Sequence, residues 1–226
     1  MQTFQELWQL LTGPDGELRG IVYTTLRLCL TSTVLSAALG IPGGAALGLY
    51  RFPGRKFLVR ICRTLMGLPP VLAGLAAFFL LSRSGPLGQY KLLYSVGAMV
   101  TAQIMLGVPI AAGLTQSVIA SSAEAIRETA YGIGLRRCRL LGRTLHECRK
   151  SFVSIVCLTF GQCLSEVGAA QICGGNIAGK TRVMTTAIVL ETNMGDFKMA
   201  GALGILLLLI SFGIMALGAW GVRADE

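Results

Sequence analysis

SSAEAIRETAYGIGLRRCRLLGRTLHECRK, residues 121–150, is a charged segment between two long hydrophobic segments. Ser121 and Glu124 have the spacing of a capping box, in which both side chains accept bonds from free amides of a first turn, so a helix is expected to begin at Ser121. Its apolar residues recur at helical spacing and form one face: Ile126, Ala130 and Ile133. Gly132 and Gly134 predict its end, because glycine readily adopts the left-handed conformation of a helix stop. Residues 135–152 predict a second short helix, so the segment is interpreted as two helices joined by a bend.

Composition places the chain among membrane proteins. It has 226 residues, of which 53% are hydrophobic and 14% charged, and a mean hydropathy of +0.66. Soluble domains carry about 25% charged residues. The net charge of +9 is concentrated in loops and not on one continuous face, which argues against nucleic-acid binding. The seven cysteines form no Cys-x-x-Cys pair and His146 is the single histidine, so no metal site is predicted.

Five hydrophobic segments are long enough to cross a bilayer, which needs roughly 20 residues. They cover residues 23–50, 63–82, 92–119, 152–172 and 199–221. Pro69 and Pro70 are expected to kink or break the second span, because proline lacks a backbone donor and its ring clashes with the preceding turn. Residues 1–20 predict a separate helix in the outer interface, anchored by Trp8. The predicted class is an all-α membrane protein in which residues 21–226 form one transmembrane domain.

Glycines mark the first predicted span as a packing helix. Gly40, Gly43, Gly44 and Gly48 lie in its second half. Helices in lipid associate through close packing, and small residues let their backbones approach. Tight packing of this span against other spans is therefore expected.

The distribution of basic residues predicts the orientation. Thirteen of the 20 Lys and Arg residues fall on one side, within residues 51–63 and 127–150 and at position 223, and seven fall on the other. The positive-inside rule places the thirteen in the cytoplasm. Five spans then give an outer N-terminus, a cytoplasmic C-terminus and a cytoplasmic segment at 121–150.

Glu166 lies inside the fourth predicted span, where an ionisable side chain is costly. One hypothesis is that it lines or gates a pathway. The other is that it is a protonated or hydrogen-bonded carboxyl that holds helices together, with Ser165, Gln162 or Gln103 as its partner. Direct binding of an anion by Glu166 is disfavoured, because a carboxylate repels an anion.

Small residues and hydrogen-bond donors follow Glu166. The run from Gly168 to Ala170 is interpreted either as a packing face or as a narrow pore lining. Residues 174–186 combine glycines with donor side chains that can receive an oxyanion, and the alternative is a solvated outer loop. The candidate residues of a translocation pathway or gate are Glu166, Gly168, Asn176, Thr181, Arg182 and Thr185.

The segment at 121–150 resembles the EAA loop of the membrane subunits of ABC importers, which has a Glu-Ala-Ala core and a glycine six residues after the Glu. Three residues match this pattern: Glu128, Ala130 and Gly134. Thr129 replaces the central alanine. The resemblance implies a coupling helix that docks in a groove of a cytoplasmic ATPase, with Ile126 and Ile133 on its apolar face.

A second resemblance is more specific. SEVGAA at 165–170, GGNI at 174–177 and TRVMTTAI at 181–188 resemble the corresponding run of tungstate-type ABC permeases, which are close to the molybdate permeases. The likeness extends over nearly the whole chain from residue 23. It implies a five-span permease subunit of a prokaryotic inner membrane that forms a homodimer around a central pathway. The implied partners are two ABC ATPase subunits, which use ATP and Mg, and an extracytoplasmic oxyanion-binding protein.

These observations predict a transport subunit with no catalytic centre and no cofactor of its own. The sequence has no glycine-rich phosphate loop ending in Gly-Lys-Ser/Thr, so a partner must hydrolyse ATP. Tungstate is the first expected substrate, and molybdate or another oxyanion is the alternative. The rival classes are an intramembrane enzyme, which needs a Ser/His, Cys/His or paired-Asp arrangement, and a membrane scaffold without transport.

Overall fold

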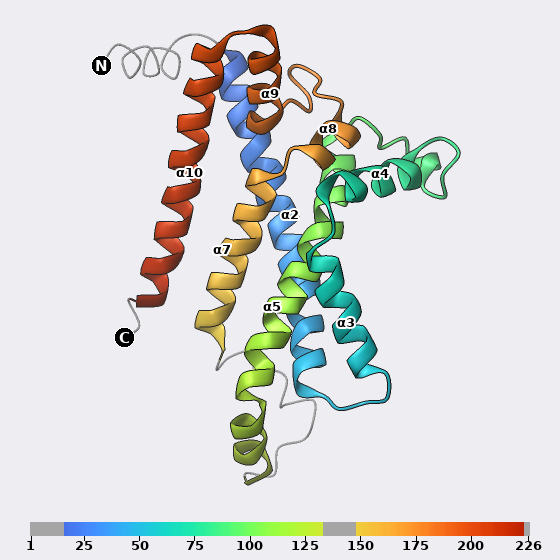
Figure 1. The fold of residues 1–226 in the computed structure, drawn as a ribbon, viewed down its shortest axis with the longest axis vertical. Helices are drawn as coiled ribbons and strands as arrows, with labels where there is room; N and C mark the ends of the chain where they lie inside the picture. Colours follow the sequence, from blue (N-terminus) through green and yellow to red (C-terminus); the bar gives the residue numbers. More distant parts are fainter. Residues whose placement is uncertain (1–15, 133–147, 224–226) are drawn as a thin grey trace.

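A computed structural model describes residues 16–132 and 148–223, and the regular structure in these ranges is entirely helical. The predicted all-α class is therefore confirmed. In chain order the elements are α2 (Gly16–Leu49), α3 (Arg55–Met66), α4 (Pro70–Leu81), the short 3₁₀ helix η1 (Gly88–Tyr90), α5 (Val96–Gly132), α7 (Arg149–Ser165), α8 (Gly168–Gly174), α9 (Met184–Met194) and α10 (Phe197–Arg223) (Figure 1).

The described residues contain up to five membrane crossings. α2, α5 and α10 are each long and apolar enough to span a bilayer. α3 with α4 and α7 with α8 form bent pairs whose axes turn by 104° and 60°. Each pair is long and apolar enough to cross a bilayer only when its two helices are counted as one span. Counting both pairs in this way gives the predicted number of five spans.

The break predicted at Pro69 and Pro70 in the second span is confirmed, whereas its predicted start at residue 63 is wrong, and the fourth span is not one continuous helix. α3 already begins at Arg55 and ends at Met66, and the chain turns before α4 begins at Pro70. The turn falls at the predicted prolines, because the first turn of a helix tolerates a residue without an N–H. The fourth span is interrupted at Glu166, whose extended backbone ends α7.

The helix start predicted at Ser121 is also wrong. α5 runs without a break from Val96 to Gly132. The Ser121 hydroxyl donates to the Val118 carbonyl at 2.7 Å, which is the back-bonding of a serine inside a helix and not a cap. Ile133, Gly134 and the predicted second helix lie outside the described residues, apart from the part that belongs to α7.

Two further differences concern short segments. Residues 16–20 belong to α2 and not to a separate interfacial helix, and the rest of that prediction lies outside the described residues. The sequence does not predict a helix in the polar stretch after α8, but this stretch contains α9, whose first turn is buried. Burial against the start of α2 and against α10 explains this helix better than its local sequence does.

The closest helix contact joins α2 and α5. A Cβ atom built on Gly44 would lie 2.2 Å from the Ala112 carbonyl oxygen, and one on Gly40 would lie 2.6 Å from the Ala111 Cβ. Gly48 faces Ile119 in the same way at 2.7 Å, whereas Gly43 faces open space. The predicted tight packing of the first span is confirmed for three of its four glycines, spaced one turn apart.

The remaining helices are arranged around this pair. α7 contacts both α2 and α5, and α10 packs on α7 and α9 (Figure 1). α4 extends sideways from the bundle and crosses α8. The two bent pairs thus meet each other, and their meeting point positions the candidate site.

Gly44→Ala is expected to lower the free energy of unfolding by about 1–3 kcal/mol, because the added methyl group forces the α2 and α5 backbones apart. Gly43→Ala is the matched control, since it faces open space and alanine favours a helix over glycine by about 1 kcal/mol. Thermal unfolding in detergent measures both effects. Equal Tm values for the two variants would contradict the close contact at Gly44.

Candidate functional site

The candidate site lies where α7 ends, α8 turns away and α9 begins. Glu166 occupies the break and is only 4% exposed. Its carboxylate Oε1 accepts a hydrogen bond from the Ala169 backbone N–H at 2.8 Å. Its own carbonyl accepts one from the Thr185 hydroxyl at 3.0 Å. Glu166 therefore caps the start of α8 and links the break to α9, and a negative group is favoured at that end of a helix.

This geometry supports the hypothesis of a hydrogen-bonded carboxyl. Its partner is not one of the side chains that the sequence offered. Gln103 instead donates to the Cys163 carbonyl at 2.9 Å, and Ser165 donates to the Gln162 carbonyl at 3.1 Å. The role of Glu166 as a gate stays a prediction.

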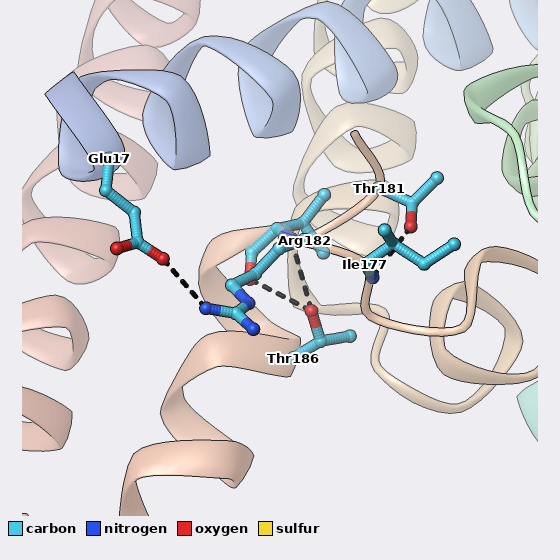
Figure 2. Close-up of polar contacts among 6 residues, drawn as sticks. Glu17, Ile177, Thr181, Arg182 and Thr186 are labelled. Atoms are coloured by element: carbon cyan, nitrogen blue, oxygen red, sulfur yellow. Dashed lines mark hydrogen bonds and ion pairs between the residues drawn. The ribbon is translucent and has the colours of Figure 1, made fainter. Parts of the chain in front are cut away.

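Thr181 closes the loop between α8 and α9. Its hydroxyl donates to the Gly174 carbonyl at 2.6 Å. The same hydroxyl accepts from the Ile177 N–H at 3.0 Å (Figure 2). The side chain is buried, and the Ile177 carbonyl accepts bonds from three following amides. The donors of this loop are thus largely used within the loop itself.

Arg182 is held by an ion pair. Its Nη1 atom lies 2.9 Å from Glu17 Oε1 on α2, a residue 165 positions earlier in the chain (Figure 2). The pair ties the α8–α9 loop to the first span. The role of Arg182 in a translocation pathway stays a prediction.

Asn176 lies at the exposed turn of the same loop. Its φ is +50°, in the left-handed region that asparagine tolerates, and the neighbouring Gly175 has a φ of +71°. Its Oδ1 atom is buried and has no partner among the described residues. Thr181, Arg182 and Asn176 are therefore brought together in one loop, separate from the Glu166, Gly168 and Thr185 group at the break.

The small residues after Glu166 form a packing face against α4. A Cβ built on Gly74 would lie 2.7 Å from the Ala169 Cα, and one on Gly168 would lie 2.9 Å from the Val71 side chain. Cys173 donates to the Gly74 carbonyl at 3.3 Å. Between the two interpretations of the run from Gly168 to Ala170, this contact supports packing.

Sequence reasoning missed several residues that hold the site together. The Thr25 hydroxyl accepts from the Met184 N–H at 2.9 Å, and the Tyr94 N–H donates to the Cys173 carbonyl at 2.9 Å. Glu17 completes the ion pair with Arg182. No local signal identifies these partners, because each belongs to a span remote in sequence.

The predicted coupling residues are only partly described. Ile126, Glu128 and Ala130 lie in the last turns of α5, and Ile133 and Gly134 lie outside the described residues. Within residues 16–132 and 148–223, no group of three or more His, Cys, Asp or Glu side chains is arranged to hold a metal ion.

Solved structures identify the fold. The chain is similar to a chain of the MetNI methionine ABC transporter in inward-facing conformations, with a TM-score of 0.73 and 16% sequence identity, over 93% of this chain and 96% of that one. The helices described above therefore have the fold of the membrane-spanning subunit of an ABC transporter. No protein-family model matches the chain.

Curated relatives define the family more closely. The chain is 37% identical to the tungstate uptake system permease protein TupB of Peptoclostridium acidaminophilum, over 94% of this chain and 93% of that protein. It is 35% identical to the TupB protein of Campylobacter jejuni, over 92% and 87%. A probable anion ABC transporter permease protein of Haloferax volcanii is also 35% identical, over 89% of both chains. The chain belongs to the family of ABC importer permeases that includes these proteins, and it is a transport subunit, not an enzyme.

Glu166→Gln is expected to leave uptake within about twofold of the wild type, because the amide oxygen can still accept from Ala169. Glu166→Leu removes the acceptor and should lower the free energy of unfolding by about 1 kcal/mol. Uptake assays and thermal unfolding of both variants measure this difference. Loss of uptake in Glu166→Gln at an unchanged Tm would contradict a purely structural role.

Proposed function

We propose that this chain is the permease of an ATP-driven tungstate importer. The observation that carries the proposal is the identity of 35–37% with two tungstate uptake permeases over nearly the full length of both chains. Molybdate is the second candidate, because a molybdenum transport permease of Mycobacterium tuberculosis is 30% identical over 90% of this chain. Relatives named for sulfate transport are more distant, at 26% identity.

The proposed assembly contains two copies of this chain around a central pathway and two ABC ATPase subunits, which use ATP and Mg. An extracytoplasmic oxyanion-binding protein delivers the substrate. The complex lies in a prokaryotic inner membrane with the N-terminus outside and the C-terminus in the cytoplasm. The excess of Lys and Arg on the side of residues 121–150 supports this orientation.

Coupling to ATP is proposed to pass through the end of α5 and the segment that follows. The apolar part of α5 ends at Ser121, but the helix continues to Gly132. At 1.5 Å per residue this continuation is roughly 16 Å long, enough to carry Glu128 and Ala130 beyond the hydrocarbon layer. ATP-driven closure of the partner subunits would move this lever, and the bundle would alternate between outward and inward openings.

Proteoliposomes that contain the assembled transporter test the substrate. Tungstate uptake should require ATP and the binding protein, and excess tungstate should compete better than molybdate, vanadate or sulfate. The competition reports differences in binding free energy between similar anions. Uptake without ATP would contradict the importer mechanism. Stronger competition by molybdate than by tungstate would identify molybdate as the preferred substrate.

Gly134→Val tests the coupling segment. The sequence predicts a left-handed turn at Gly134, which a β-branched residue would oppose, so uptake is expected to fall by about tenfold or more while membrane insertion is retained. Gly43→Val is the control, since Gly43 faces open space on α2. Normal ATP-driven uptake by Gly134→Val would count against the coupling role.

A further inference from the structure

A hollow of about 640 Å³ lies at the far end of α4, where the chain turns back towards α5. Its lining residues come from one short loop and include two cations: Arg83, Gly85, Pro86, Gly88, Gln89 and Lys91. The wall contains no carboxylate. Neither the mechanism proposed above nor the candidate site uses this loop.

The loop is held in shape by its own backbone. The Leu87 N–H donates to the Leu80 carbonyl at 3.0 Å, which folds the loop back on the end of α4. Gly88 is buried, and a Cβ on it would lie 2.2 Å from the Ser82 carbonyl oxygen. Lys91 adopts a φ of +49° at the exit of the loop. The two cations are therefore presented by a preorganised loop and not by a flexible tail.

The charges at this hollow differ from those of the loop between α8 and α9. Arg182 is paired with Glu17, whereas Arg83 and Lys91 have no ion-pair partner among the described residues. Both side chains are exposed and line one hollow, so an anion bound in the hollow is attracted by both charges. Gln89 adds amide donors, and guanidinium and ammonium groups bind tetrahedral oxyanions through charge-assisted hydrogen bonds.

The loop that forms the hollow is also joined to α8 at the candidate site by a backbone hydrogen bond. After Lys91, Tyr94 donates to the Cys173 carbonyl at 2.9 Å and its ring lies against Gly175. The loop thus lies at the end of the bundle that carries α8 and α9 (Figure 1). Under the proposed orientation this end faces outward, where the substrate arrives.

We infer that the hollow lined by Arg83, Gln89 and Lys91 is an oxyanion subsite, which receives a tetrahedral dianion at the outer mouth before it enters the bundle. This inference rests on the proposed function for its orientation and substrate class. Two positive charges around one hollow raise the local concentration of a dianion and the rate of its capture.

The experiment is equilibrium binding of tungstate to the assembled transporter in nanodiscs without the binding protein, with bound tungsten measured by elemental analysis. The double variant Arg83→Gln/Lys91→Gln should raise the Kd about tenfold, and each single variant should raise it less. Arg19→Gln/Lys198→Gln is the matched control, because it removes the same two charges from exposed positions away from the hollow. Its Kd should equal that of the wild type.

Equal Kd values for both double variants, or no tungstate binding by the wild type, would overturn the inference. A second arm measures the affinity of the substrate-free binding protein for the same nanodiscs. If the Arg83→Gln/Lys91→Gln variant weakens that affinity and leaves tungstate binding unchanged, Arg83 and Lys91 bind acidic groups of the binding protein. The inference of an oxyanion subsite is then wrong. ATP-driven tungstate uptake by the wild type is measured in parallel. If that uptake is present, a negative binding result rejects the subsite and not the proposed function.

Discussion

The structure depends on the close approach of α2 and α5. In a bilayer the hydrophobic effect does not hold helices against one another, so association relies on packing and on interhelical hydrogen bonds. Gly40, Gly44 and Gly48 have no side chains that would separate the two backbones. Ala111 and Ala112 on α5 present only small side chains to them. α3 and α7 pack on this pair, and α7 in turn supports α10. A displacement of α5 therefore reaches most of the bundle.

The two helix breaks are the second feature of the design. Irregular backbone is tolerated at membrane depth only where its polar groups find partners inside the protein. Glu166 and Thr185 supply such partners at the break between α7 and α8, and the Cys173 thiol joins α8 to α4 through its hydrogen bond to the Gly74 carbonyl. Because these bonds join separate helices, the breaks and α9 are held as one unit.

The sequence predicts the parts of this design that depend on local composition. The long apolar runs correspond to α2, α5 and α10, the double proline marks the break before α4, and the glycines of the first span mark its packing face. Features that depend on distant residues were missed or wrong. The first turn of α9 is buried against α2 and α10, and no local sequence signal predicts this packing or the ion pair of Arg182 with Glu17. The capping box predicted at Ser121 is wrong because a capping box and a back-bonded serine have the same local sequence.

Site-specific crosslinking can test whether the ATP of a partner subunit drives this bundle through residues 121–150. A photoreactive amino acid is placed at position 130 in the assembled transporter, with position 198, on the opposite end of the bundle in the proposed orientation, as the control. Position 130 is expected to crosslink to the ATPase subunit with a yield that changes when ATP binds, and position 198 is not expected to crosslink. Labelling of position 130 by a membrane-impermeant reagent from outside intact cells, with no crosslink to the ATPase, would contradict it.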